Sequence, residues 1–195
     1  MKTPSTLVLA STSPFRKEIL AKLGLDFDTA SPNIDESPLE NETPEQLVKR
    51  LAELKARAVA DDFPAHLIIG SDQVAVIDGE ILGKPHTHER AVEQLNNASG
   101  KTVRFYTGLC LYNSKTTSCQ SEAVLFDVVF RKLTASQIEN YLQAEKPYNC
   151  AGSFKSEALG ITLFEKLVGD DPNTLIGLPL IRLVAMMEKQ GLNPI

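Results

Sequence analysis

The chain has 195 residues, of which 43% are hydrophobic and 23% charged, and its formal net charge is −5. This length suits one domain, and the composition is ordinary for a globular protein. The acidic balance provides no basic surface field, so it argues against non-specific nucleic-acid binding as the main function. We therefore expect one domain over residues 1–195 and no nucleic-acid partner.

The cysteine pattern and the hydrophobic runs indicate the cellular compartment of the protein. Cys110, Cys119 and Cys150 are odd in number and lack a CxxC spacing, which favours reduced thiols over a disulfide framework or a zinc site. The apolar run Leu7–Ala10 is too short for the core of a signal peptide. No stretch approaches the ~18 apolar residues that a membrane span needs. We expect a cytoplasmic protein without a membrane partner.

The apolar pattern predicts strands and helices in alternation. In chain order we expect a strand over residues 6–10, a helix over 14–24, a strand over 25–30, a loop over 32–44, a helix over 44–62 and a strand over 66–77. There follow a hairpin turn at 78–79, a helix over 87–98, strands over 103–113 and 122–131, a helix over 134–145, a strand over 160–168 and a helix over 178–189. Thr43 and Thr134 are the expected N-caps of two helices. The order predicts an α/β fold in which helices flank a mixed β-sheet.

The first candidate site is the Ser/Thr-rich turn between the first strand and the first helix. Free backbone N–H groups at a helix N-terminus attract anions. Ser11 and Ser13 add hydroxyl groups, and the guanidinium of Arg16 matches phosphate oxygens. The turn therefore favours a phosphate site, although an ordinary capped helix with a surface arginine remains an alternative.

The second candidate site is a pair of acidic segments. Asp72 interrupts an apolar strand, where a carboxylate is costly unless it is paired, bound to metal or catalytic. Glu36 lies in a polar loop. Two such carboxylates could hold Mg²⁺ or Mn²⁺, and one could accept a proton from an attacking water. A structural role for Asp72 and a solvated position for Glu36 remain open.

Four cations are candidates for compensating the charge of a polyphosphate. Lys55 borders the buried face of its helix, because it lies four residues after Leu51. Lys84 occupies a rigid turn and Lys155 a glycine-containing segment. Together with Arg16 they could form a positive pocket in an acidic protein. Taken singly, each lysine fits a solvated surface position better than a binding role.

Taken together, these segments resemble the Maf family of nucleotide pyrophosphatases. The matching segments, in family order and spread over nearly the whole chain, are LASTSPFR (9–16), DE (35–36), RLAELKA (50–56), IIGSDQV (68–74), GKP (83–85), YTGL (106–109), AGSFKSEALG (151–160) and GLPL (177–180). The resemblance implies two lobes around a deep nucleotide-binding cleft, a divalent cation, and cleavage of a nucleoside triphosphate between the α- and β-phosphates. A homodimer is among the assemblies that it allows.

The resemblance also assigns roles to residues. It implies that Asp72 is the general base, a ligand of the metal, or both, and that Glu36 is one of the other polar residues of the cleft. Ser11, Ser13 and Arg16 match its phosphate-binding turn, and Lys55 and Lys84 match further polar cleft residues.

Substrate choice is implied by Phe15, Gln73 and Glu157, which resemble the branch that prefers 7-methyl-GTP. Methylation at N7 makes guanine cationic, so an aromatic face attracts it and a carboxylate can bind its N1–H and exocyclic amine. A core-facing position for Phe15 is the alternative from the residues alone. The alternative functions are a dTTP or UTP pyrophosphatase of the same family, and a nucleotide-binding regulator of septum formation that does not cleave.

Overall fold

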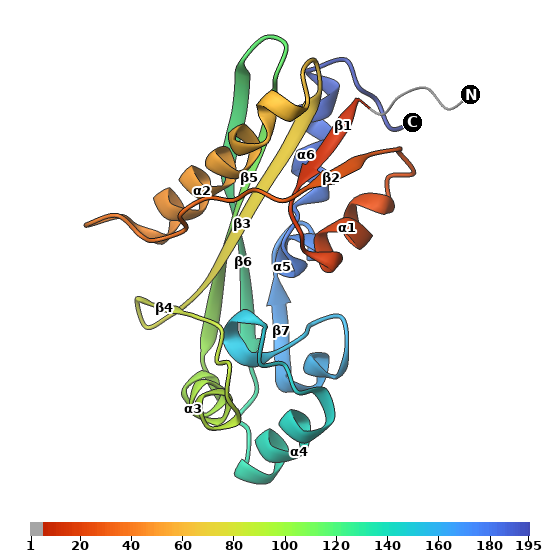
Figure 1. Cartoon of the computed structure of the whole chain (residues 1–195). Coiled ribbons are helices and arrows are strands. Elements are labelled where there is room, and N and C mark those ends of the chain that lie inside the picture. The colour runs from red at the N-terminus through yellow and green to blue at the C-terminus, as the bar shows by residue number, and fades with distance from the viewer. Residues whose placement is uncertain (1–5) are drawn as a thin grey trace. The chain divides into compact units, whose positions relative to one another are not determined.

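The computed structural model describes residues 6–195, in which seven strands form one mixed sheet (Figure 1). The strands are β1 (Leu7–Ala10), β2 (Asp28–Ala30), β3 (Leu67–Ile77), β4 (Glu80–Leu82), β5 (Thr102–Asn113), β6 (Ser118–Phe130) and β7 (Phe164–Val168). The helices are α1 (Pro14–Ala21), α2 (Pro44–Ala58), α3 (His88–Ala98), α4 (Ala135–Glu145), α5 (Pro172–Ile176) and α6 (Leu180–Glu188). Short 3₁₀ helices are η1 (Ala60–Asp62), η2 (Ala151–Ser153) and η3 (Leu159–Leu163). The predicted α/β class with a mixed sheet is confirmed.

The sheet runs in the order β2-β1-β3-β5-β6-β7, and β4 pairs with β3. β1 is parallel to both of its neighbours, with Leu9 opposite Thr29 of β2 and Ile69 of β3. β4 and β7 are antiparallel to β3 and β6. The β3–β4 turn is the predicted hairpin, in which Asp78 and Gly79 both have positive φ angles.

The chain divides into two compact units. Unit 1 comprises the chain through Gln73, Thr107–Val124 and Asp171–Ile195, and unit 2 comprises Val74–Tyr106 and Leu125–Asp170. The three long strands β3, β5 and β6 contribute residues to both units. A single domain over residues 1–195 and a cleft between two lobes stay predictions, and residues 1–5 lie outside the described part.

Two hydrophobic clusters cover opposite faces of the unit 1 strands. Leu7 and Leu9 of β1 pack with α1 and α6, whereas Val8 and Ala10 pack with α2. This division follows from the alternation of side chains along a strand. Successive residues of β3 therefore face different helices, which matters for the site below.

Helix α2 lies unusually close to the sheet. A Cβ atom at Gly70 of β3 would stand 2.0 Å from the carbonyl oxygen of Ala52, and one at Gly108 of β5 would stand 2.0 Å from that of Val48. Only glycine permits this approach of backbone to backbone. The N-terminus of α2 is fixed by a capping box between Thr43 and Gln46, which confirms the predicted N-cap.

Unit 2 has an aromatic core. Phe105, Phe130, Phe154 and Phe164 make edge-to-face contacts with ring centroids 4.9–5.6 Å apart. This is the arrangement that aromatic quadrupoles prefer.

Some predicted boundaries were wrong. Residues 159–163 form the 3₁₀ helix η3, and only Phe164–Val168 is a strand. The reason is a tight turn, because the Thr162 hydroxyl donates to the Leu159 carbonyl and Gly160 packs directly against the backbone of Lys155. The strand expected over residues 25–30 is confined to Asp28–Ala30, and the short helix α5 was not predicted.

Candidate active site

The site residues of unit 1 lie beyond the carboxyl ends of parallel strands. β1 leads directly into the Ser11–Arg16 turn, and β2 leads into the loop that carries Glu36. β3 continues past the end of β1 and carries Asp72. In open α/β sheets, ligands bind at this edge of the strands.

Lys55 joins the two predicted carboxylates. Its Nζ lies 2.7 Å from Oδ1 of Asp72 and 3.0 Å from Oε1 of Glu36. The side chains of Lys55 and Asp72 are only 8% and 9% exposed, whereas that of Glu36 is 56% exposed. The buried charge of Asp72 is therefore compensated, as the sequence required.

Arg16 belongs to the same electrostatic environment. Its Nε donates to the carbonyl oxygen of Gly177 at 2.9 Å. Burial lowers the pKa of the guanidinium, while the carboxylates of Asp72 and Glu36 act in the opposite direction. Two cations and two carboxylates thus meet in unit 1, and the bond to Gly177 engages Nε rather than the outer nitrogens.

The hydroxyls of the Ser11–Arg16 turn shape its backbone. Ser13 is the N-cap of α1 and accepts from the backbone N–H of Arg16 at 3.4 Å, and Ser11 accepts from the N–H of Ser13 at 3.1 Å. The capped-helix interpretation is therefore correct for Ser13, and it is compatible with phosphate binding at the same turn. Phe15 is 38% exposed, so it is not a core residue.

Ser71 and Gln73 flank Asp72 and point to the opposite face of the sheet. The Ser71 hydroxyl donates to the Gly177 carbonyl at 2.9 Å. Nε2 of Gln73 donates to Oγ1 of Thr107 and to the carbonyl oxygen of Thr174, each at 2.8 Å. The side chain of Gln73 is therefore held in place by unit 1 itself.

The remaining predicted residues belong to unit 2. Lys84 is exposed in the turn after β4. Lys155 donates to the carbonyl oxygen of Glu145 at 3.3 Å and lies 3.7 Å from its carboxylate. Glu157 is exposed and accepts from the Ser156 hydroxyl at 3.3 Å. The structure joins none of these three to another predicted site residue within unit 2.

The donors available for a metal ion are oxygens. Within residues 6–195 no cluster of three or more His, Cys, Asp and Glu side chains is arranged to hold a cation. Mg²⁺ and Mn²⁺ do not need one, because they are often held by one or two carboxylates together with water and substrate phosphates. Asp72 and Glu36 fit that pattern, since both reach the same ammonium group.

A family model described as Maf-like protein matches residues 6–190. The chain belongs to the Maf family. This membership confirms the resemblance carried by the eight sequence segments.

Relatives of nearly equal length carry one name. A protein of Aliivibrio fischeri named 7-methyl-GTP pyrophosphatase is 61% identical over 189 residues, which cover 97% of this chain and 98% of that protein. Proteins of the same name from Nitrosococcus oceani and Colwellia psychrerythraea are each 60% identical over 188 residues, covering 96% of this chain and 94% of each relative.

Solved structures show the fold alone. The Ham1 protein of Staphylococcus aureus matches with a TM-score of 0.53 at 15% identity, covering 94% of this chain and 98% of that one. A HAM1 protein from Coxiella burnetii matches with a TM-score of 0.52 at 13% identity and the same coverage. In the described part of the chain, no helix has the length and apolar character to cross a membrane.

Sequence reasoning missed two parts of the site. The segment Asp171–Gly177 supplies the carbonyls that hold Arg16, Ser71 and Gln73. Its signals were present, because an aspartate N-cap followed by proline starts a helix and Gly177 ends it. The second missed part is Arg50. Its partners Ser37 and Glu42 lie in the loop before α2, and no local sequence pattern predicts these contacts.

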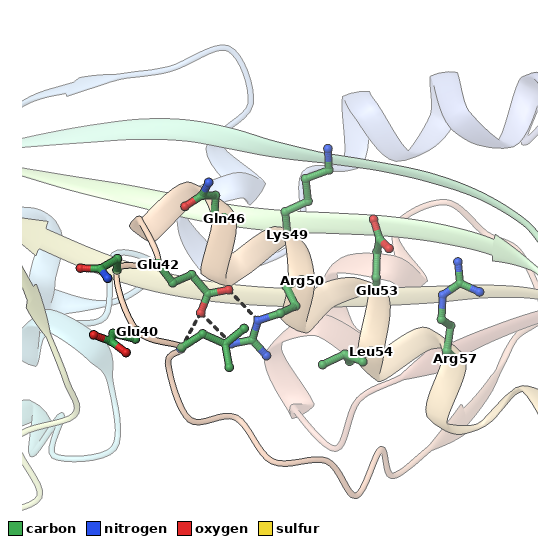
Figure 2. A pocket seen from close by; sticks show the side chains of 10 residues that line it. Glu40, Glu42, Gln46, Lys49, Arg50, Glu53, Leu54 and Arg57 are labelled. Atoms are coloured by element: carbon green, nitrogen blue, oxygen red, sulfur yellow. Dashed lines mark hydrogen bonds and ion pairs between the residues drawn. The ribbon is translucent and has the colours of Figure 1, made fainter.

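A cavity of about 600 Å³ lies beside α2 (Figure 2). It is lined by the loop segment Leu39–Glu42 and by α2 side chains from Gln46 to Arg57. None of the predicted site residues lines it. Its wall does contain the contact between Arg50 and Glu42.

Proposed function

We propose that the chain hydrolyses 7-methyl-GTP to 7-methyl-GMP and pyrophosphate. The observation that carries this proposal is the 60–61% identity, over nearly the whole length, to three proteins named 7-methyl-GTP pyrophosphatase. The cluster of Arg16, Glu36, Lys55 and Asp72 supports it, because hydrolysis of a polyphosphate needs a positioned carboxylate among cations. Clearing modified nucleotides from the pool is the role that this activity implies.

Asp72 is proposed as the general base. Its carboxylate is held by Lys55 and would orient and deprotonate a water for attack at the α-phosphorus. The proton then resides on Asp72, and pyrophosphate leaves. Arg16, the Ser11–Ser13 turn, Lys55, Lys84 and Lys155 would bind the phosphates.

A divalent cation, Mg²⁺ or Mn²⁺, is the proposed cofactor. Asp72 and Glu36 would hold it, and when bound it neutralises phosphate charge and polarises the bond that breaks. Removing the metal with a chelator should abolish turnover, and adding Mg²⁺ or Mn²⁺ should restore it.

Base recognition is proposed for Phe15, Gln73 and Glu157. Phe15 presents a half-exposed aromatic ring, which suits stacking on the cationic ring of 7-methylguanine. Glu157 is exposed and could accept from the N1–H and the exocyclic amine. Gln73 is already held by unit 1, which would present its side chain in a fixed orientation.

The deciding experiment is a substrate panel. The purified protein is incubated with Mg²⁺ or Mn²⁺ and 7-methyl-GTP, GTP, dTTP, UTP or CTP, and released pyrophosphate is measured. Strong preference for 7-methyl-GTP is the expected outcome. Preference for dTTP or UTP would keep the family and reject the base-recognition argument. Tight binding of nucleotide without turnover would instead support a regulator of septum formation.

Phe15→Arg tests the stacking argument directly. An arginine would repel a cationic base, so kcat/KM for 7-methyl-GTP should fall far more than that for dTTP. A cation–π contact is worth ~1–2 kcal/mol when desolvated, or roughly a five- to thirtyfold effect. Equal losses on the two substrates would reject the role of Phe15.

A homodimer and a cytoplasmic location are also proposed. Sedimentation equilibrium of the purified protein would distinguish a monomer of 21.3 kDa from a dimer.

A further inference from the structure

The position of Glu36 needs an explanation. Its side chain is 56% exposed, so burial does not hold it beside Lys55. It lies between β2 and α2, in a stretch where the structure contains no helix or strand. Local bonds shape this stretch, since the backbone N–H of Ser37 donates to Asp35 and that of Leu39 donates to Glu42. These bonds fold the loop but do not attach it to α2.

Arg50 makes that attachment. Its Nε and Nη2 donate to the two carboxylate oxygens of Glu42 at 2.6 and 2.7 Å (Figure 2). Nη2 also donates to the carbonyl oxygen of Ser37 at 3.1 Å. The Arg50 and Glu42 side chains are 24% and 7% exposed, so water screens this pair less than a surface pair. The Arg50 guanidinium therefore binds the loop at two points. One is Ser37, the residue after Glu36, and the other is Glu42, at the end of the loop.

The same helix carries the partner of Glu36. Arg50 and Lys55 both lie on α2, whose backbone is a rigid helix in contact with the sheet at Gly70 and Gly108. Arg50 therefore fixes the loop relative to the same body that presents the Lys55 ammonium to Asp72.

We propose that Arg50 and Glu42 are positioning residues that hold the loop so that Glu36 stays beside Lys55 and Asp72. The inference rests on the proposed function, in which Glu36 and Asp72 hold the cation. Neither Arg50 nor Glu42 touches the reacting atoms. Lysine is not equivalent to Arg50, because the planar guanidinium sets two N–H donors in a fixed fork against the two carboxylate oxygens of Glu42, whereas an ammonium group is a point charge without this geometry.

The test compares Arg50→Lys with Arg182→Lys. Arg182 and Glu122 form a pair of the same fork geometry, at 2.6 Å for both bonds, on another part of unit 1. Mn²⁺ affinity is measured by electron paramagnetic resonance on the protein without nucleotide, and kcat and the Mn²⁺ activation constant are measured with 7-methyl-GTP. Arg50→Lys should weaken Mn²⁺ binding and activation by roughly 10–100-fold, the usual effect of losing a residue that orients a metal ligand. Arg182→Lys should change neither.

A double-mutant cycle separates positioning from general stability. If Arg50 acts through Glu36, then Arg50→Lys should have little further effect on Mn²⁺ affinity in a Glu36→Gln background. Additive losses, or an equal loss in Arg182→Lys, would overturn the proposal.

Hydrogen exchange gives a readout that does not depend on activity. The backbone N–H groups of Ser37 and Leu39 should exchange faster in Arg50→Lys than in the parent or in Arg182→Lys. Unchanged exchange in Arg50→Lys would overturn the proposal that Arg50 holds the loop, even if the variant remains active. If no nucleotide is hydrolysed by the parent, the proposed function fails, and exchange alone still decides whether Arg50 holds the loop.

Discussion

The carboxylate of Asp72 is tolerated inside a strand because helix α2 brings the Lys55 ammonium beside it. Lys55 lies 2.7 Å away and is buried with it, and Glu36 shares the same ammonium from the solvent side. The carboxylate of Asp72 is thus held in one orientation, and the ammonium group that compensates it is shared with Glu36. Such an arrangement suits a group that must bind a proton or a cation during a reaction.

Asp72→Asn tests this role. Asparagine has the same shape, its amide oxygen can still accept from Lys55, and Glu36 still balances the lysine charge. Turnover should fall by roughly 10²–10⁴-fold, the usual contribution of a general base, while the melting temperature stays nearly unchanged. Asp127→Asn, which removes a carboxylate paired with Arg104 on an exposed part of unit 2, serves as control and should leave activity intact. Full activity in Asp72→Asn would reject the role.

For single residues, the sequence predicted which side chains carry the chemistry but not which groups they contact. An acidic residue in an apolar strand and a lysine at the edge of an apolar helix face were readable, and both are buried as expected. The partner of Arg16 was not readable, because it is the backbone carbonyl of Gly177, which lies 161 residues away. Periodicity describes one element and does not give the distance between two elements.

At the scale of elements, the spacing between α2 and the sheet decides whether Lys55 reaches Asp72. That spacing is set by Gly70 and Gly108, where the Cβ atom of any other residue would clash with the backbone of α2. Both glycines were part of the segments that carried the family resemblance, yet their packing role depends on neighbours that are distant in sequence.

Gly70→Ala should therefore impair both stability and activity. The new methyl group would meet the Ala52 carbonyl at 2.0 Å, so α2 must move away from the sheet and carry Lys55 with it. Overpacking of this kind costs ~1–3 kcal/mol. Leu183→Ala is the control, because it destabilises the cluster on the other face of the sheet and leaves α2 untouched. At matched stability Gly70→Ala should be the less active variant; equal activity would show that the spacing does not matter.

Element prediction succeeded where capping and periodicity agreed. Thr43 and Thr134 both form capping boxes, and α2 and α4 begin where they were expected. It failed over residues 160–163, where apolar residues without a clear period suited a strand equally well. The short helix α5 was missed because its five residues are too few to show a helical period.

For the whole molecule, the stability of the folded state at low pH depends on several carboxylates whose pKa values are lowered by folding. Hydrogen bonds from Arg50 lower the pKa of Glu42 below its ordinary value of 4.5, and a bond to Gln143 is the main cause of a lowered pKa at Glu139. A carboxylate with a lowered folded pKa binds fewer protons in the folded than in the unfolded protein. Its stabilising contribution is present above the unfolded pKa and is lost as pH falls through the folded one.

Melting temperature as a function of pH checks this sign. The parent should exceed Glu42→Gln in melting temperature at neutral pH, and the difference should begin to shrink below about pH 5 as the carboxylate becomes protonated. Glu122→Gln provides the comparison, since Glu122 binds Arg182 with the same fork geometry. A difference that is independent of pH would show that the loss comes from packing and not from charge.

The three consecutive residues Ser71, Asp72 and Gln73 serve partners on alternating faces of one strand. Inserting or deleting one residue before them would exchange the faces, which would place the carboxylate against backbone carbonyls and an uncharged group against the Lys55 ammonium. Substitutions can be tested here one at a time, but a change of length cannot be absorbed by a neighbouring loop, because the strand continues on both sides. Among natural variants of this protein, the interval from Gly70 to Gln73 should therefore keep its length.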